Sequence, residues 1–377
     1  QLILSNQPVG FTVQTTDAGS IRRIKANVSG SDDADSIAAD SEGKASFEMS
    51  DYLQGLITTR HKTGDVAVKY TDVPALVSFN FQTLVGNPPN AGSELATGYY
   101  FLLDGFVPKL RRKSLYSQYA NLLEYLQDKR CCLTWFPNTE TKQVSKDQKE
   151  FINFMQVFDL ENPCDLRVNI ILNLDDDTTR VMVDVFSALN VNPFEILYIP
   201  VGYTQLGIEQ YLYNWNREND TWIWAKSYTV YIYNSALDLL SQKYTFEIDE
   251  KYTQNARTLY IRNPFGLLEI VKCTGITGQD NNLKLQTART DGKVLPDRIN
   301  WKIDRTYDVK VNTGFMTSAQ LQWLSDMDFT EAYELISGNL VPIVFGELKF
   351  PVMHDGDYQY SAEMEYEYAY NEITEHA

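Results

Sequence analysis

Histidine and cysteine are scarce in this chain, and no segment stays apolar over a long run. The 377 residues include 3 histidines and 4 cysteines. His61, His354 and His376 lie far apart, and neither a Cys-x-x-Cys pair nor the Cys/His spacing of a zinc site occurs. No apolar run reaches the roughly 18 residues that a membrane-spanning helix requires. The sequence therefore argues against a metal centre and against membrane insertion.

Motifs for nucleophilic catalysis and for nucleotide binding are also missing. The sequence has no Gly-x-Ser-x-Gly elbow, no phosphate-binding loop of the Gly-x4-Gly-Lys-Ser/Thr type and no Gly-x-Gly-x-x-Gly fingerprint. Paired carboxylates for glycoside hydrolysis stay open, because such pairs form in space and 50 acidic residues supply many candidates. We expect no catalytic residue and no cofactor, and interpret the chain as a non-enzymatic protein.

Basic residues are outnumbered by acidic ones. The chain has 33 Lys and Arg against 50 Asp and Glu, which gives a formal net charge of −17. A field of this sign repels nucleic acid and anionic lipid, so we expect neither as a partner. One basic cluster stands out, formed by Lys109, Arg111, Arg112 and Lys113. We interpret it as a patch that meets an acidic partner surface, with a phosphate site or a solvated helix start as the alternatives.

The four cysteines predict buried thiols rather than a disulfide framework. Cys131 and Cys132 are neighbours, and neighbouring residues in a strand point to opposite faces. A bridge between Cys164 and Cys273 is left open.

Aromatic residues are abundant, which excludes a disordered chain. The 24 tyrosines and 18 phenylalanines lie in short β-branched and aromatic runs separated by Gly, Asn and Asp. This pattern predicts a mainly β protein with a few short helices, built from two or three β-sandwich-like modules in tandem. We expect an N-terminal β-sandwich (1–90), a central β-rich domain with one amphipathic helix (91–250) and a C-terminal β-rich domain with one short helix (251–377). Residues 86–93 read as a linker.

Several elements can be predicted individually. Leu115 to Leu126 has the apolar spacing of a helix, residues 131–137 return to a strand, and 166–174 with 179–185 predict a hairpin around three aspartates. Ser318 opens a short helix, and 339–345 reads as a buried strand. The last strand, 363–370, alternates Glu with Met or Tyr, so one face should carry carboxylates and the other apolar or aromatic residues.

Five aromatic residues flank the polar segment 216–220. They are Tyr211, Tyr213, Trp215, Trp222 and Trp224. They could form a stacking surface for sugar rings, or they could be half-buried residues of a hairpin. Their alternation fits two paired strands, so we expect the hairpin and keep all five as candidate contacts for a glycan or a partner protein.

Three groups of segments carry a resemblance to a known class of proteins. They are Gly105-Phe-Val-Pro-Lys-Leu-Arg-Arg-Lys with Leu133-Thr-Trp-Phe-Pro-Asn-Thr; Leu259-Tyr-Ile-Arg-Asn-Pro-Phe-Gly-Leu-Leu-Glu; and Val311-Asn-Thr-Gly-Phe with Gln322-Trp-Leu-Ser-Asp, Leu340-Val-Pro-Ile-Val-Phe and Glu365-Tyr-Glu-Tyr-Ala-Tyr. In these segments the chain resembles uncharacterised virion proteins, tail- or baseplate-associated, of phages and prophages of Bacteroidetes. The resemblance implies an architecture and a context, and no catalytic site.

Two functions follow as expectations. The first is a structural protein of a phage-like particle that contacts other virion proteins or itself, located in the virion and, during assembly, in the host cytoplasm. The second is an exported surface adhesin that binds carbohydrate through the aromatic residues. The chain begins at Gln1, and either a removed export signal or a trimmed terminus explains the missing initiator methionine.

Overall fold

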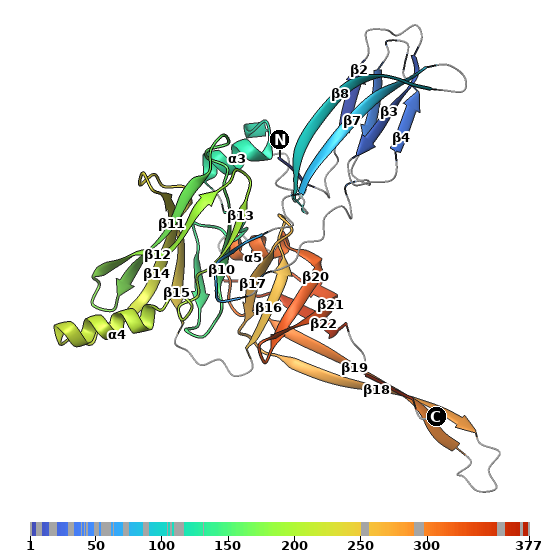
Figure 1. Ribbon diagram of the computed structural model, residues 1–377. Coiled ribbons are helices and arrows are strands. Elements are labelled where there is room, and N and C mark those ends of the chain that lie inside the picture. Colours follow the sequence, from blue (N-terminus) through green and yellow to red (C-terminus); the bar gives the residue numbers. More distant parts are fainter. Residues whose placement is uncertain are drawn as a thin grey trace. The chain divides into compact units, whose positions relative to one another are not determined.

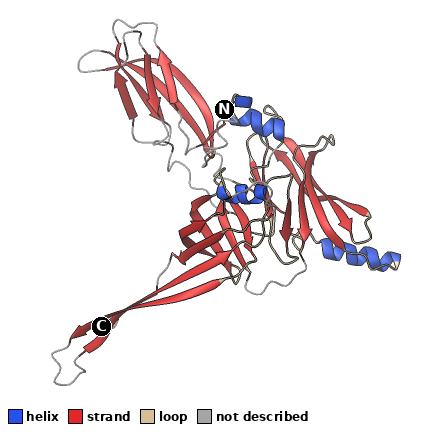
Figure 2. Cartoon of the chain, turned by 180° about the vertical axis from the view of Figure 1, so that it is seen from behind, coloured by secondary structure: helices blue, strands red, loops and turns tan. Residues whose placement is uncertain are grey.

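The structure is a computed structural model of a mostly β chain that divides into two compact units (Figure 1). Unit 1 comprises Gln1–Ile248 and Pro264–Leu267, and unit 2 comprises Asp249–Asn263 and Leu268–Ala377. Strands dominate and the helices are short, as the sequence predicts (Figure 2). The described residues are 2–4, 10–14, 21–28, 34–38, 40, 42, 44–48, 53, 62, 64–70, 75–85, 90–103, 105, 108, 117–130, 132–249, 256–289, 298–352, 359–369 and 372–375.

The N-terminal part of unit 1 contains two sheets. The larger has the order β1-β8-β7-β3-β4 and the smaller pairs β2 with β5. Their strands are β1 (Leu2–Leu4), β2 (Gly10–Gln14), β3 (Ile21–Val28), β4 (Ala34–Ala38), β5 (Lys44–Glu48), β7 (Ala75–Val85) and β8 (Asn90–Leu103). Phe11 and Phe47 from the small sheet pack against Phe79 and Phe81 of β7, with ring centroids 4.6–5.5 Å apart. Aromatic contact between facing sheets is the packing that a β-sandwich requires.

The predicted linker 86–93 needs a correction. Asn90 begins β8 and pairs with Val85 at the end of β7. The second half of that segment therefore belongs to a paired strand, although its Pro, Gly and Asn content is typical of a linker.

The central part of unit 1 packs two further sheets around an apolar core. One has the order β12-β11-β14-β15-β9 and the other β10-β13-β6. Their elements are β6 (Val68–Lys69), β9 (Thr141–Val144), β10 (Phe151–Met155), β11 (Cys164–Leu174), β12 (Thr179–Val191), β13 (Ile196–Pro200), β14 (Ala225–Asn234) and β15 (Tyr244–Ile248), with helices α3 (Leu122–Lys129) and α4 (Ile208–Asn219). Ile170 and Val230 from one sheet and Ile152 and Ile199 from the other are buried in one cluster. The predicted hairpin is confirmed, since β11 and β12 pair around residues 175–178.

Two local predictions in this region need correction. Cys132–Phe136 was expected in a strand, but it lies in no strand and is mostly buried. The N–H of Leu133 instead donates to the carbonyl of Asn153, 2.6 Å away, which ties this segment to β10. The helix predicted from Leu115 to Leu126 is interrupted: residues 117–118 are helical, 119–121 are not, and residues 115–116 lie outside the described part. Helix α3 then runs over Leu122–Lys129, and the side chain of Asn121 accepts from the N–H of Glu124 at 3.0 Å to cap its start.

Strand β12 forms one edge of its sheet and is interrupted by a bulge. The register with β11 shifts between Val168 and Ile170, which face Phe186 and Met182. Asp184 lies in this bulge with a left-handed backbone, φ 51°. Its N–H donates to the side chain of Asn169 at 2.8 Å. The carboxylate of Asp184 accepts a hydrogen bond from Arg167 at 3.1 Å and another from the hydroxyl of Tyr233. The residue at the bulge is an aspartate, a polar residue that can adopt the left-handed backbone conformation needed where the regular strand pairing is interrupted.

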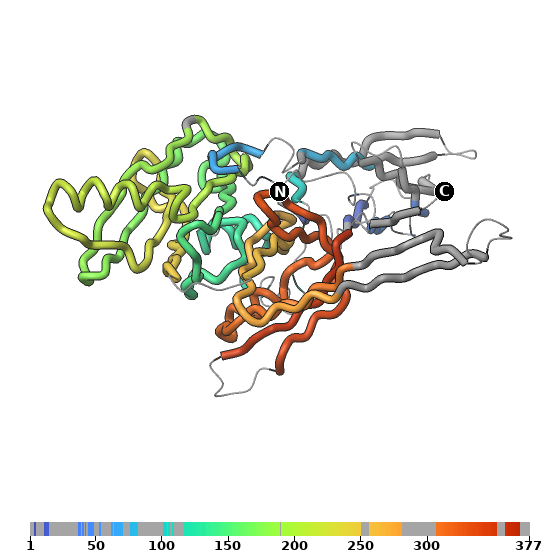
Figure 3. The backbone as a smooth tube through the Cα atoms, turned by 90° about the horizontal axis from the view of Figure 1, so that it is seen from below, coloured from blue at the N-terminus to red at the C-terminus, as the bar shows by residue number. Residues whose placement is uncertain are grey.

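Unit 2 is built on one large sheet. Its order is β17-β16-β20-β21-β22-β19-β18, and β23 adds to β19. In Figure 3 the orange and red part of the tube runs back and forth through the described strands of this sheet. The elements are β16 (Arg257–Arg262), β17 (Leu268–Cys273), β18 (Gly278–Arg289), β19 (Arg298–Asn312), α5 (Ser318–Ser325), β20 (Asp328–Ile336), β21 (Asn339–Lys349), β22 (Glu363–Tyr368) and β23 (Glu372–Glu375).

Helix α5 is confirmed, and its start explains why it forms. Thr317 is the N-cap, its hydroxyl accepts from the N–H of Gln320 at 3.2 Å, and the Gln320 side chain accepts from the N–H of Thr317 at 3.1 Å. This reciprocal capping box satisfies two backbone donors that would otherwise lack partners. Leu321 and Leu324 bury the inner side of the helix.

A buried carboxylate links three strands of unit 2. Glu334 of β20 accepts from Arg257 of β16 at 2.5 Å and from the hydroxyls of Tyr366 and Tyr368 of β22, each at 2.8 Å. Because β21 lies between β20 and β22 in the sheet, these bonds reach across a strand. The buried charge is thus paired and fully hydrogen-bonded, which is the condition for keeping it inside.

The closing strand β22 has the two faces that its alternation predicts. Met364 and Tyr366 are buried, whereas Glu363 and Glu367 are exposed. The strand predicted at 339–345 is confirmed as part of β21 (Asn339–Lys349), but its predicted burial is wrong. Most side chains of β21 are half-buried or exposed, and Val344 is 59% exposed.

The described cysteines give no disulfide. Cys164 in unit 1 and Cys273 in unit 2 are free thiols, so the bridge left open above does not form. Burial raises the pKa of Cys164 to about 11 and that of Cys273 to about 12. Within the described part of the chain, no helix has both the length and the apolar character to span a bilayer.

Candidate functional site

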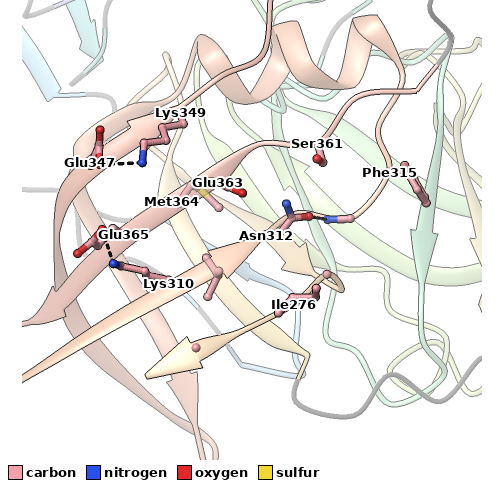
Figure 4. A pocket seen from close by; sticks show the side chains of 14 residues that line it. Ile276, Lys310, Asn312, Phe315, Glu347, Lys349, Ser361, Glu363, Met364 and Glu365 are labelled. Atoms are coloured by element: carbon pink, nitrogen blue, oxygen red, sulfur yellow. Dashed lines mark hydrogen bonds and ion pairs between the residues drawn. The ribbon is translucent and has the colours of Figure 1, made fainter. Parts of the chain in front are cut away.

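A groove lies on unit 2. It has a volume of about 560 Å³ and lies across β18, β19, β21 and β22 and the turns beside them (Figure 4). Its lining residues are Gly275, Ile276, Gly278, Lys310, Val311, Asn312, Gly314, Phe315, Glu347, Lys349, Ser361, Glu363, Met364 and Glu365. Residues of four strands (β18, β19, β21 and β22) and of two turns converge here, so segments far apart in the sequence meet in one groove.

Two large apolar side chains mark one end of the groove. Ile276 is 91% exposed and Phe315 is 79% exposed. Burying a side chain of this size stabilises a protein or a complex by about 1.5–3 kcal/mol. Two such residues left in water at one groove are a signature of an interaction surface.

Two glycines hold these side chains in place. Gly275 follows β17 and Gly314 follows β19, and a Cβ on either would overlap the opposite turn, at Asn312 and at Thr274 respectively. Gly314 also has φ +77°, a conformation that favours glycine. The N–H of Gly275 donates to the carbonyl of Asn312 at 3.0 Å. The turns can therefore pack tightly, and each presents its next residue, Ile276 or Phe315, to solvent.

Charged side chains cover the rest of the groove. Lys310 pairs with Glu365 across β19 and β22 at 3.5 Å, and Lys349 pairs with Glu347 at 3.1 Å (Figure 4). The hydrogen bond that Lys349 donates to Glu347, and the charge of Glu347, raise the pKa of Lys349. Glu363 also lines the groove and lies opposite Lys349 in register, but no ion pair joins it to a described residue. The two lysines are thus neutralised, and the remaining charge is negative.

The bulge in β21 shapes this charged wall. The register between β21 and β22 shifts from Phe345–Tyr366 to Leu348–Met364. Gly346 and Glu347 together therefore oppose Glu365, which adds one outward carboxylate beside the regular row of β22.

The predicted aromatic cluster lies on unit 1 and is not a hairpin. Residues 208–219 form α4, in which Ile208, Leu212 and Asn216 face the core. The hairpin prediction is therefore wrong, because the aromatic alternation hid a helical repeat of inward residues. The guanidinium of Arg180 lies over the ring of Trp215, with its central carbon 3.3 Å from the ring centroid. Tyr211 packs against the apolar core.

Only part of the aromatic set comes together. Tyr213 and Trp224 line one small pocket with Thr204, Glu209 and Gln210. Trp222 is 75% exposed and lies outside that pocket lining. The basic cluster 109–113 lies outside the described residues.

The sequence reasoning missed the groove, and one signal was available. Thr274-Gly-Ile-Thr-Gly and Asn312-Thr-Gly-Phe both place an apolar residue directly after a glycine, a pattern typical of a tight turn. That these residues are exposed follows only from the packing of the two turns against each other. Among the described residues, no group of three or more His, Cys, Asp or Glu is placed to hold a metal ion.

Comparison with known proteins gives little. No family model and no curated protein matches the chain. Two solved structures are similar to 32% of it: the tail of an empty GTA particle (14% identity, 96% of that chain, TM-score 0.23) and the virion of a native gene transfer agent particle (12% identity, 95% of that chain, TM-score 0.20). A likeness this small does not establish a shared fold.

Proposed function

We propose that this chain is a non-enzymatic structural protein of a phage-like particle, tail- or baseplate-associated, that works through contacts with other particle proteins or with copies of itself. The observation that carries the proposal is the groove of unit 2, with Ile276 and Phe315 exposed at one end and charged residues along the rest. An apolar centre beside a polar rim is the usual composition of a protein interface. The sequence resemblance to virion proteins supplies the context.

Association through the groove can be tested directly. Size-exclusion chromatography with light scattering, over a wide concentration range, should show concentration-dependent assembly that Phe315→Ser weakens. A purely monomeric wild-type chain at every concentration would contradict self-assembly. Leu237→Ser is the matched control, because Leu237 is a 77% exposed apolar residue on unit 1.

The particle context can be tested from the neighbouring genes. The proposal expects genes for capsid, tape-measure or tail-sheath-like proteins beside this one. Genes for outer-membrane transport or glycan degradation would argue for a surface protein instead.

The pocket beside α4 favours a second function, carbohydrate binding by an exported surface protein. Tyr213 and Trp224 offer aromatic faces, and Glu209, Gln210 and Thr204 offer hydrogen-bonding groups beside them. Aromatic stacking combined with polar contacts suits a sugar ring. A glycan array tests this function: binding lost in Trp224→Ala supports it, while no hit, or full binding in Trp224→Ala, removes it.

A further inference from the structure

The row of carboxylates on β22 continues the groove away from its apolar end. Glu363, Glu365 and Glu367 alternate along the strand on the solvent side. Alternate residues of a strand lie about 6.7 Å apart. Glu363 pairs in register with Asn312, the residue that precedes the turn carrying Phe315. Along the groove the order is therefore apolar end, Glu363, Glu365, Glu367.

The charge of this row is available to a ligand. Glu365 is engaged by Lys310, and Lys349, which lies opposite Glu363 in register, pairs with Glu347. Within the described ranges, no ion pair engages Glu363 or Glu367 directly. Like charges aligned on one strand repel each other, and a basic ligand would relieve that repulsion. Because the chain carries a net charge of −17, few segments of another copy could approach this row favourably.

One segment of the chain has the complementary pattern. Val107, Lys109, Arg111 and Lys113 alternate in the sequence, one apolar residue followed by three cations. If this segment binds in an extended conformation, its alternate side chains point to the same side and are about 6.7 Å apart, as the glutamates of β22 are. Val107 would then meet Ile276 and Phe315 while the three cations meet the three carboxylates.

We propose that the groove of unit 2 binds the segment Phe106–Lys113 of a second copy of this chain. The inference rests on the proposed function and names the partner at this site. The contact is heterologous, since one copy supplies the groove and the other the segment, so it can be repeated from copy to copy. Salt should weaken it, because the charges meet at the surface.

Fluorescence anisotropy with a labelled peptide of residues 104–115 tests the groove itself. We expect saturable binding to the wild-type chain. Binding should weaken at least tenfold in Glu363→Gln/Glu367→Gln, and likewise in Phe315→Ser. Glu218→Gln, an exposed carboxylate on α4, should leave binding unchanged. No binding, equal binding of a shuffled peptide, or equal binding to the double variant would overturn the inference.

A mixing experiment tests the copy-to-copy arrangement. Glu363→Lys/Glu367→Lys destroys the groove, and the neutral variant Lys109→Gln/Arg111→Gln/Lys113→Gln removes the cations of the segment without complementing the new lysines. Each variant alone should fail to assemble, whereas a mixture should form pairs that stop at two copies. Wild-type assembly that neither variant changes would refute this contact and leave the structural function standing. A wild-type chain that never associates, while the peptide still binds, would limit the groove to basic segments of other proteins and refute the second-copy assignment.

Discussion

Each unit contains a buried carboxylate, but the hydrogen-bond partners of the two carboxylates lie at very different separations in the sequence. Glu150 of unit 1 accepts from Lys142 and Gln148, eight and two residues before it, at 2.8 and 2.6 Å. Glu334 of unit 2 is held by β16 and β22, with partners up to 77 residues away. The first bond network organises a local segment beside an apolar core. The second fixes how three strands of one sheet lie relative to each other.

Both regions bury apolar side chains, and from this comparison we expect polar contacts between distant strands to contribute more to unit 2 than to the central part of unit 1. If so, single substitutions at those contacts should affect unit 2 over long distances. Substitutions at the matching features of unit 1 should act locally. The following experiments test this contrast.

Removing Glu334 should have the largest effect. Glu334→Ala leaves Arg257 and two tyrosine hydroxyls without their acceptor, so the free energy of unfolding of unit 2 should fall by about 3 kcal/mol or more. Glu150→Ala should cost less, about 1–3 kcal/mol. Denaturant unfolding measures the loss of stability in each variant, and hydrogen exchange shows which strands are affected. Glu334→Ala should increase exchange in β16, β20 and β22 together, and Glu150→Ala only near residues 141–151. Equal, local effects would break the comparison.

Gly314→Ala should come next. A Cβ there would overlap Thr274, and the positive φ is unfavourable for alanine, so we expect a loss of about 1–3 kcal/mol from unit 2. Gly207 on unit 1 also has positive φ, 66°, but no atom lies near its missing Cβ. Gly207→Ala should therefore cost less, about 1 kcal/mol. Thermal unfolding of both variants measures the difference, and an equal loss would show that the turn contact contributes nothing.

The helix caps give a smaller contrast. Thr317→Ala removes the capping box of α5 and should cost about 1 kcal/mol. Helix α4 has no side-chain cap to lose, because its N-cap is Gly207. Thr317→Ser keeps a hydroxyl and serves as the control. If Thr317→Ser destabilises as much as Thr317→Ala in denaturant unfolding, the hydroxyl is not the cause.

The smallest effect is a pH dependence. Burial is the largest of the causes that raise the pKa of Tyr368 to about 12, and the hydrogen bond to Glu334 and the negative charge of Glu334 also contribute. A raised folded-state pKa contributes stability below the unfolded value near 10, and that contribution is lost as the pH rises from 10 to 12. Because Tyr368 is half-exposed, we expect less than about 1 kcal/mol. Wild type should lose more unfolding free energy between pH 9 and 11.5 than Tyr368→Phe does. Identical slopes would contradict the assignment.

The sequence could predict elements whose local signals agree with their packing. The hairpin of β11 and β12, helix α5 and the two faces of β22 all combine a clear period with clear ends. Helix α4 was missed because Tyr211, Tyr213 and Trp215 alternate like a strand, while the inward repeat of Ile208, Leu212 and Asn216 includes a polar residue. The glycine at its start also gave no capping signal.

The candidate site was harder to predict, because it depends on contacts between distant segments. The carboxylate row could be read from the alternation in β22. That Ile276 and Phe315 are exposed depends on the packing of two turns against each other, at Gly275 and at Asn312, which are 37 residues apart. An apolar residue beside a glycine looks the same in the sequence whether it is buried or exposed.

The bulge at Asp184 has a consequence for the behaviour of many copies together. Strand β12 is the free edge of its sheet, and Val181 and Val183 are exposed along it. A regular edge of that kind would template the addition of another strand and lead to fibres. The bulge breaks its hydrogen-bonding repeat, and the charged bonds of Asp184 with Arg167 and Tyr233 hold the interruption in place. The edge is therefore a poor template for the addition of a further strand.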